Sequence, residues 1–347
     1  MIRVLVAEDS DTTRALLVAL LSADPEIEVV GEAPNGAQAV ELTRELRPDL
    51  VTMDVKMPVL DGYAATRKIM TETPTPIVIV SANVKPRDVD SAMHALRAGA
   101  LAVVRTPSGP ASGRFDEEVQ YFLDTIKAMS SVKVVRRWPD RGTSSDPVRG
   151  QTRSTVDIIG IAASTGGPAA VLSLLTALPA DFPVPILVVQ HMAREFVAGC
   201  AEWLDSHSPL QVKVAAHRER LVPGTVYFAP DDRHLGVADG HAILDAGPPL
   251  AGFRPSGTFL FRSLAASYGA GVVAVILTGM GRDGVDGLHD VHEAGGEVIA
   301  QDEASCVVFG MPQAAIADGV TSSVLPLSSI PHRLIHLANL RERSHRP

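Results

Sequence analysis

The sequence predicts an α/β protein of two domains, in which an N-terminal sheet of five strand–helix repeats precedes a doubly wound α/β domain. Short apolar segments alternate with helical patterns up to about residue 125, and the alternation restarts at Val156. Between these regions, residues 133–155 lack hydrophobic periodicity and are rich in Pro, Gly, Ser and Arg. The length of 347 residues agrees with two domains, because a domain typically holds about 150 residues.

Five strands and five helices are expected in the N-terminal domain. The expected strands cover residues 3–7, 28–30, 50–53, 77–80 and 102–104, and the expected helices cover residues 12–22, 36–46, 62–72, 87–98 and 115–130. Repeated strand–helix units favour an open parallel sheet with helices on both faces. Ligands of such folds bind beyond the carboxyl ends of the strands. The first helix carries an apolar stripe that can face this sheet, made of Leu16, Leu17, Leu20 and Leu21.

Composition and charge exclude several classes of protein. With 46% hydrophobic and 20% charged residues, the chain is expected to be globular rather than disordered or collagen-like. A net charge of −9 and only 4% aromatic residues disfavour nucleic-acid binding. Cys200 and Cys306 form no metal-spaced pair and are interpreted as buried apolar residues, with a thiol enzyme or redox sensor as the alternative. Because we find neither a signal peptide nor a membrane span, we expect a reduced, cytoplasmic protein.

Residues 133–155 are interpreted as part of an interdomain linker. Six basic residues against two acidic ones give this segment a charge of +4 within an acidic chain. A solvated tether explains the composition, and a docking strip for an acidic partner is the alternative. We place the first domain at residues 1–127, the linker at 128–154 and the second domain at 155–341.

Acidic residues gather where the N-terminal strands end. Glu8 and Asp9 close the first strand, Asp54 closes the third and Ser81 closes the fourth. Carboxylates at one sheet edge repel one another unless a cation neutralises them, and oxygen ligands suit Mg²⁺. Asp54 is then a candidate nucleophile toward a phosphoryl group, and Ser81 is placed to hydrogen-bond that group. Simple strand-end capping is the alternative.

The N-terminal domain resembles the receiver domain of two-component response regulators. The resemblance rests on VLVAEDS, VTMDVKMPVLDGY, IVIVSA and GALAVVRTP. It implies that Asp54 is phosphorylated by a histidine kinase. It also implies that Mg²⁺ is bound by Glu8, Asp9, Asp54 and the main-chain carbonyl of Lys56.

Two positions depart from the receiver pattern. Receivers usually carry a Lys just before the last Pro, where this chain has Thr106, and often an aromatic residue where it has Val103. Arg105 is a poor substitute for that Lys, because neighbouring strand residues point to opposite faces. We therefore expect Asp54 to be phosphorylated and the response to phosphorylation to be altered.

The second domain begins with a strand, a small-residue turn and a helix, in VDIIGIAASTGGPAAVLSLLTAL. Ser164 lies on that turn, where Gly166 and Gly167 permit close approach and Pro168 suits the first helical turn. A helix N-terminus favours developing negative charge. The arrangement is typical of a nucleophile elbow, although Ala162 stands in place of the first Gly of G-x-S-x-G. A phosphate-binding loop and a plain helix cap are the alternatives.

Two further strand ends provide a candidate base and its partner. PILVVQHM ends at His191, a candidate general base, with a half-buried loop histidine as the alternative. GVVAVILTGMGRDGVDG ends in a glycine-rich turn that contains Asp283. We expect Asp283, rather than its competitor Asp286, to accept the Nδ1–H of His191. The backbone N–H groups of Met280 and Gly281 are candidates for an oxyanion hole.

Residues 155 to 340 resemble the catalytic domain of the chemotaxis methylesterase family CheB. The resemblance rests on IGIAASTGGP, ILVVQHM, RPSGTFLFRSLA, VILTGMGRDG and IAQDEASCVVFGMPQAAI. It implies hydrolysis of glutamate γ-methyl esters on chemoreceptors without a cofactor, and often deamidation of receptor glutamines. Ser164 would be the nucleophile, His191 the base and Asp283 its partner. An unphosphorylated receiver would cover the site until a chemotaxis histidine kinase acts.

Several residues depart from the family pattern without removing a member of this triad. Substrate choice stays open for this reason, and two other hypotheses are a receptor-binding adaptor with poor turnover and a hydrolase of another ester. Added carboxylates near the site would disfavour an acidic receptor helix. The departures are Ala193, Asp231, Asp232, Phe253, Gly257, Thr258 and Cys306.

Overall fold

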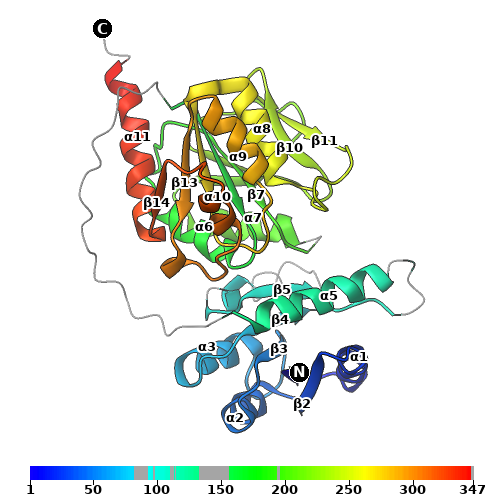
Figure 1. Ribbon diagram of the computed structural model, residues 1–347. Coiled ribbons are helices and arrows are strands. Elements are labelled where there is room, and N and C mark those ends of the chain that lie inside the picture. The colour runs from blue at the N-terminus through cyan, green and yellow to red at the C-terminus, as the bar shows by residue number, and fades with distance from the viewer. Residues whose placement is uncertain are drawn as a thin grey trace.

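The structure is a computed structural model, in which both sheets are assembled as the strand–helix alternation predicts (Figure 1). It describes residues 1–81, 93–96, 98–109, 113, 115–132, 156–193 and 196–344. The predicted linker segment 133–155 lies outside these residues, so the proposed domain boundaries stay predictions.

The N-terminal domain has a five-stranded sheet in the order β2-β1-β3-β4-β5, with all neighbouring strands parallel. All five expected strands and four of the expected helices are present, and most of the expected helix at 87–98 lies outside the described residues. Side-chain caps begin three of the helices at Ser10, Asn35 and Asp61, each accepting a main-chain N–H. The elements are β1 Ile2–Ala7, α1 Asp11–Ser22, β2 Ile27–Ala33, α2 Gly36–Leu46, β3 Leu50–Asp54, α3 Gly62–Glu72, β4 Ile77–Ser81, β5 Ala102–Arg105 and α5 Phe115–Ser130.

The C-terminal domain has a seven-stranded parallel sheet in the order β14-β13-β12-β6-β7-β9-β8 and a two-stranded antiparallel hairpin. The sheet strands are β6 Ile158–Ala163, β7 Ile186–Gln190, β8 Gln211–Val214, β9 Thr225–Phe228, β12 Val272–Ile276, β13 Glu297–Gln301 and β14 Ser323–Leu325. The hairpin is β10 His234–Ala238 with β11 His241–Asp245. The helices are α6 Gly167–Thr176, α7 Phe196–His207, α8 Gly257–Tyr268, α9 Val285–Glu293, α10 Met311–Ala317 and α11 Ile330–Ser344.

Alternation along β6 explains why helices cover both faces of this sheet. Ile159 and Ile161 pack into the cluster that contains α6, α7 and α11, whereas Ile158 and Ala162 pack into the cluster that contains α8, α9 and α10. Figure 1 shows α11 and α8 on opposite sides of the strands. All residues of β6, β7 and β12 are buried, and each buried Ile or Val contributes about 1.5–3 kcal/mol to folding.

The strand order determines where a ligand can bind. The chain runs from β6 to β7 on one side and returns to β12 on the other side of β6. Strand order therefore reverses at β6, and in doubly wound sheets the ligand crevice opens beyond the carboxyl ends at such a point. Among the residues described, no helix is both long and apolar enough to cross a membrane.

Candidate active site

Strand register brings the ends of β6 and β7 together. Ala163 of β6 pairs with Gln190 of β7, so Ser164 and His191 each follow directly after a strand. The His191 main-chain N–H donates to the Ala163 carbonyl at 2.9 Å. The buried Gln190 amide joins the two ends further, because its Nε2 donates to the carbonyls of Ser164 and His191, both at 2.8 Å. The predicted nucleophile and base are therefore neighbours.

Glycines shape the turn that carries Ser164. Gly166 has φ +75°, a conformation that side-chain-bearing residues rarely adopt. A Cβ on Gly167, at the start of α6, would lie 2.0 Å from the Oε1 of Gln190. The Ser164 main-chain N–H donates to the Thr278 carbonyl at 3.0 Å. Ser164 is thus held between the end of β6 and the loop after β12.

Asp283 lies in that loop, and its side chain is fully buried. Its carboxylate accepts hydrogen bonds from Ser256 Oγ at 2.7 Å, Gly257 N at 2.6 Å and Thr258 N at 3.3 Å. His191 Nε2 lies 2.9 Å from the same carboxylate. Burial by itself would raise the pKa of Asp283, but the hydrogen bonds and the adjacent imidazole outweigh it and lower the pKa to about 2. The carboxylate is therefore ionised at neutral pH.

Burial also separates Asp283 from its competitor. The Asp286 side chain is 60% exposed and pairs with Arg282 at 3.4 Å, away from His191. Only Asp283 of these two carboxylates contacts the histidine ring.

The predicted choice of ring nitrogen is wrong. Asp283 contacts Nε2 of His191 rather than Nδ1. The reason is the strand order, because His191 follows β7 and Asp283 follows β12, with β6 between them. The ring nitrogen farther from the main chain must span that distance. Nδ1 is left buried and without a hydrogen-bond partner among the described residues. Ser164 follows β6, the strand next to the one that His191 follows.

Sequence reasoning missed the residues that hold the acid–base pair. Phe253 stacks on the His191 ring, with centroids 4.3 Å apart and planes 10° apart. Ser256, Gly257 and Thr258 surround Asp283 with donors. All four lie in or beside the RPSGT run, where the sequence indicated a family motif and departures at Phe253, Gly257 and Thr258 but no contact with His191 or Asp283. The clustering of departures there was the available signal.

The proposed oxyanion donors lie in the loop after β12. Met280 is 50% exposed and Gly281 has φ +82°. The Gly279 carbonyl accepts from the main-chain N–H groups of Gly310 and Met311, at 3.0 and 2.9 Å. Those bonds anchor the loop, whereas the N–H groups of Met280 and Gly281 donate to no partner in the described part of the chain. Their role as oxyanion donors stays a prediction.

A second polar site lies at the carboxyl edge of the N-terminal sheet. Oxygens of Glu8, Asp9 and Asp54 all lie within 4.8 Å of one another. Burial first, and then the Asp54 charge, raises the pKa of Glu8 to about 7. Burial, with a contribution from Asp9, raises the pKa of Asp54 to about 6. Three mutually repelling oxygen ligands suit a hard divalent cation, so the residues fit the predicted Mg²⁺.

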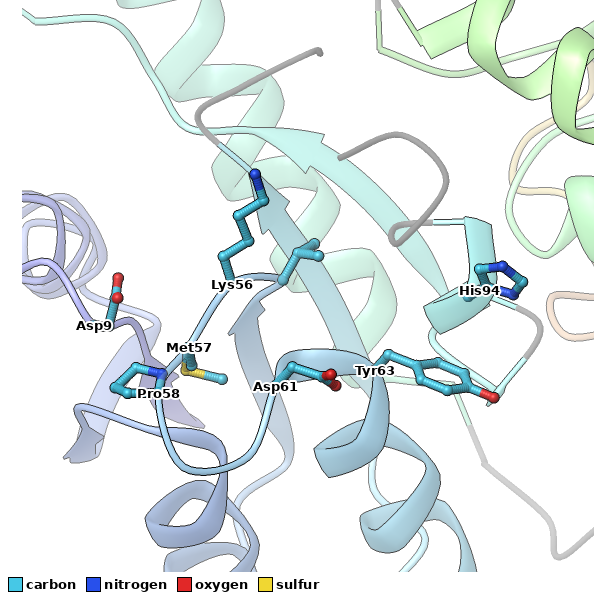
Figure 2. Close-up of a pocket in the computed structure, with 8 residues that line it drawn as sticks. Asp9, Lys56, Met57, Pro58, Asp61, Tyr63 and His94 are labelled. Carbon is cyan, nitrogen blue, oxygen red and sulfur yellow. The ribbon is translucent and has the colours of Figure 1, made fainter. Parts of the chain in front are cut away.

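This acidic edge opens into a cavity of about 610 Å³. Figure 2 shows Asp9 and Lys56 on one side of it and Tyr63 and His94 on the other. The lining residues are Asp9, Val55, Lys56, Met57, Pro58, Asp61, Tyr63 and His94.

The position of the missing receiver lysine lies next to this edge. The Thr106 main-chain N–H donates to the Ser81 carbonyl at 3.1 Å. The Thr106 hydroxyl is buried and has no hydrogen-bond partner among the residues described. Arg105 pairs with Ser81 across the β4–β5 ladder. Thr106 therefore provides no cation where receivers usually place one.

Comparison with known proteins identifies both domains. A CheB methylesterase family model matches residues 159–334, and a response regulator receiver domain model matches residues 4–112. A Myxococcus xanthus (strain DK1622) protein, named protein-glutamate methylesterase/protein-glutamine glutaminase 4, is 53% identical over 339 residues, which cover 96% of each chain. The chain belongs to the CheB methylesterase family. Both resemblances inferred from the sequence are thus confirmed.

Other members of the CheB family agree. An Anaeromyxobacter dehalogenans (strain 2CP-C) protein, named protein-glutamate methylesterase/protein-glutamine glutaminase 3, is 53% identical over 337 residues, covering 96% of this chain and 98% of that protein. The crystal structure of the Thermotoga maritima CheB methylesterase catalytic domain matches with a TM-score of 0.51 and 44% identity, covering 53% of this chain and all of that one. The predicted fold class is confirmed.

Among the departures from the CheB pattern, Asp232 has a partner within the chain. Its carboxylate accepts from Arg254 Nε at 3.0 Å and from the terminal nitrogen of the same guanidinium at 2.5 Å. The negative charge of Asp232 is thus paired with Arg254, and the expectation that added carboxylates disfavour an acidic receptor helix stays a prediction. At another departure, the Thr258 hydroxyl accepts the Gly284 main-chain N–H at 3.0 Å.

Neither cysteine has the character of a nucleophile. Burial raises the pKa of Cys200 to about 12. Burial first, and then the charge of Asp302, raises the pKa of Cys306 to about 12. Both thiols are protonated at neutral pH, and a protonated thiol is a poor nucleophile.

Proposed function

We propose that the protein hydrolyses glutamate γ-methyl esters on chemoreceptors, releasing methanol, and that phosphorylation of Asp54 controls this activity. The observation that carries the proposal is the buried His191–Asp283 pair, which lies at the end of β7 next to the end of β6, where Ser164 follows. Family membership supports the reaction class. The names of the relatives support glutamate methyl esters as substrates and receptor glutamine amides as additional ones.

The proposed reaction is acyl transfer in two steps. His191 Nδ1 takes the Ser164 hydroxyl proton while Oγ attacks the ester carbonyl carbon. Asp283 stabilises the resulting imidazolium through Nε2–H. The N–H groups of Met280 and Gly281 donate to the oxyanion.

Collapse of the tetrahedral intermediate breaks the bond to the methoxy group. The proton held on Nδ1 of His191 passes to the leaving oxygen, so that methanol departs and an acyl-enzyme on Ser164 remains. Water then gives a proton to the same nitrogen and attacks the acyl carbon. The bond from Ser164 Oγ to that carbon breaks, the proton on Nδ1 returns to Oγ, and the glutamate product is released. The hydrolysis needs no cofactor.

In the receiver, an Asp54 carboxylate oxygen attacks the phosphorus of the kinase's phosphohistidine. The aspartyl O–P bond forms as the P–N bond breaks and the kinase histidine leaves. Glu8, Asp9, Asp54 and the Lys56 carbonyl would hold Mg²⁺, which supplies charge neutralisation for the incoming phosphoryl oxygens. Ser81 provides a hydroxyl at the same edge. Thr106 leaves the phosphoryl group without the usual lysine contact.

Contacts between the domains support regulation by occlusion. The Gly166 N–H, two residues beyond Ser164, donates to the receiver's Leu101 carbonyl at 3.2 Å. Val307 and Val308 of the catalytic domain pack against the receiver core that contains Leu101. The Leu101 carbonyl of the receiver thus accepts a main-chain N–H that lies two residues from Ser164. Phosphorylation of Asp54 would activate by weakening this contact.

The test is methanol release from methylated chemoreceptor, with and without a small-molecule phosphodonor. We expect release that rises with phosphodonor in the wild type and is absent in Ser164→Ala. Equal release with and without the phosphodonor would support the esterase activity and contradict its control by phosphorylation. Release by Ser164→Ala at the wild-type rate would contradict the mechanism. No release from any methylated receptor would favour the adaptor or another ester as substrate.

A further inference from the structure

Phe253 occupies the position where the CheB family usually has a histidine, and its ring lies on the imidazole of His191. The ring centroids are 4.3 Å apart and the planes are 10° apart. This is a face-to-face stack, and the His191 side chain is only 10% exposed. One face of the proposed general base is therefore covered by a ring that cannot donate, accept or take up a proton.

Hydrogen bonds hold the loop that carries Phe253. Phe253 and Leu250 exchange two main-chain hydrogen bonds, at 2.9 and 3.0 Å. The next residue is Arg254, and its Nη1 donates to the carbonyls of Ala246 and Gly247, at 3.1 and 2.8 Å. Phe253 thus lies in a closed loop, held at its own main chain and at the following side chain.

Asp232 anchors this loop to the rest of the domain. Two nitrogens of the Arg254 guanidinium donate to its Oδ1. Asp232 has φ +57°, a conformation that favours glycine, and glycine is the residue usual in the family at this position. The carboxylate therefore offsets an unfavourable backbone conformation by gaining a charge-assisted hydrogen bond to Arg254.

Two departures from the family thus belong to one structural unit. Phe253 replaces a histidine, Asp232 replaces a glycine, and Arg254 connects them. We propose that Phe253 is a positioning residue for His191, and that the Asp232–Arg254 pair holds it in place. The inference rests on the proposed Ser164–His191–Asp283 mechanism.

The stack serves the two ring nitrogens at once. The proposed mechanism needs Nε2 on Asp283 and Nδ1 directed toward Ser164, and a rotated ring would lose the Asp283 contact and this alignment. A parallel aromatic face restricts that rotation and excludes water from one side of the ring. The same face attracts the imidazolium that forms as Ser164 loses its proton. The contribution is therefore made in the transition state, which affects kcat rather than KM.

The chain provides a matched control for this stack. Phe259 stacks on His234 with centroids 4.7 Å apart and planes 14° apart. His234 lies on the hairpin strand β10, and its Nε2 contacts the Pro248 carbonyl at 3.1 Å. Phe259→Leu removes a stacked ring from a histidine outside the triad. Phe253→Leu makes the same change on His191.

The experiment measures kcat and KM for methanol release by the full chain, with methylated chemoreceptor as substrate and saturating phosphodonor. We expect Phe253→Leu to lower kcat about 5- to 10-fold with KM within about 2-fold, and Phe253→Tyr, which keeps the ring, to restore most of kcat. Phe259→Leu should keep kcat within about 2-fold of the wild type. Unchanged kcat in Phe253→Leu, or a rise in KM alone, would overturn the proposal.

Asp232→Gly tests the Asp232–Arg254 pair. It also keeps the proposal testable if Phe253→Leu does not fold. Glycine suits the backbone at this position and removes the carboxylate that pairs with Arg254. We expect a kcat loss of about 2- to 5-fold, and a double variant that loses less than the product of the two single losses. Full kcat in Asp232→Gly would overturn the role of the anchor. Ser164→Ala and His191→Ala test the underlying mechanism separately, because activity in either would contradict the triad whatever Phe253 does.

Discussion

The acidic edge of the receiver and the candidate active site both lie at the carboxyl edge of a parallel sheet, but the pKa values of their carboxyl groups are shifted in opposite directions. In the receiver, the pKa of Glu8 is raised to about 7 and that of Asp54 to about 6. In the catalytic domain, the pKa of Asp283 is lowered to about 2, although its side chain is fully buried. Burial acts in the same direction at all three groups, so the neighbours decide the outcome.

The neighbours differ in sign. Glu8 and Asp54 face each other and Asp9, which disfavours their ionised forms until a cation arrives. Asp283 faces a hydroxyl, two main-chain N–H groups and an imidazole, all of which donate to it. The receiver edge therefore suits the proposed cation and phosphoryl group. The catalytic edge is preorganised before any substrate binds.

The largest expected effect comes from removing the Asp283 charge. Asp283→Asn disrupts the contact that orients His191 Nε2, and we expect methanol release to fall on the order of 10⁴-fold. Stability should fall by about 1–3 kcal/mol as well, because buried donors lose their acceptor. The measurements are turnover with saturating phosphodonor and thermal unfolding.

Asp286→Asn is the control for this variant. Its side chain is 60% exposed, so we expect turnover close to that of the wild type. A comparable loss in both variants would mean that charge near the loop, rather than the bond to His191, matters.

Restoring the receiver lysine should sharpen the contrast between the two edges. Thr106→Lys places a cation next to Ser81, where the Thr106 hydroxyl has no partner among the residues described. We expect the phosphodonor-induced rise in methanol release to increase several-fold, because the lysine contacts the phosphoryl group on Asp54. Basal release without phosphodonor should not change. If the phosphodonor-induced increase in methanol release is the same in Thr106→Lys as in the wild type, the protein responds to phosphorylation without a lysine contact.

The two edges should respond to pH with opposite sign. The ordinary values for Glu8 and Asp54 are 4.5 and 3.8, so the unfolded chain loses these protons first as the pH rises. Receiver stability should therefore fall between about pH 4 and pH 7 in the absence of divalent cations. The contribution of Asp283 is present above about pH 4 and is lost as the pH falls toward 2.

Calorimetry with EDTA or Mg²⁺ measures this difference. With EDTA we expect the receiver transition to move down by about 4 °C or more between pH 5 and pH 8, and Mg²⁺ to reverse the change at pH 8. Glu8→Gln should flatten the pH dependence and reduce the Mg²⁺ response. A receiver transition that rises with pH in EDTA would contradict the raised pKa values.

The smallest effect is expected from Cys306→Ser, which introduces the serine common in the family. Cys306 contacts Thr278, beside the turn of Ser164, but its thiol stays protonated at neutral pH. We expect turnover of Cys306→Ser within about 2-fold of the wild type. In the folded wild-type protein, we expect iodoacetamide to alkylate Cys306 slowly. Rapid alkylation that abolishes turnover would give this residue a role that its high pKa argues against.

Sequence by itself determined the strands and four helices of the first domain, three strands and the first helix of the second, and the strand ends on which Ser164, His191, Asp283 and Asp54 lie. Those features depend on local periodicity and chain direction, which a linear pattern contains. The sequence also showed the resemblance to receiver domains and to the CheB family, because the motifs around these strand ends are long.

Tertiary structure alone decided which groups meet and through which atoms. The placement of β6 between β7 and β12 selects Nε2 of His191 for Asp283. The donors of the RPSGT run, the Phe253 stack and the Asp232–Arg254 pair join residues from separate loops. Such contacts follow from strand order and loop closure in three dimensions, which no local pattern of residues encodes.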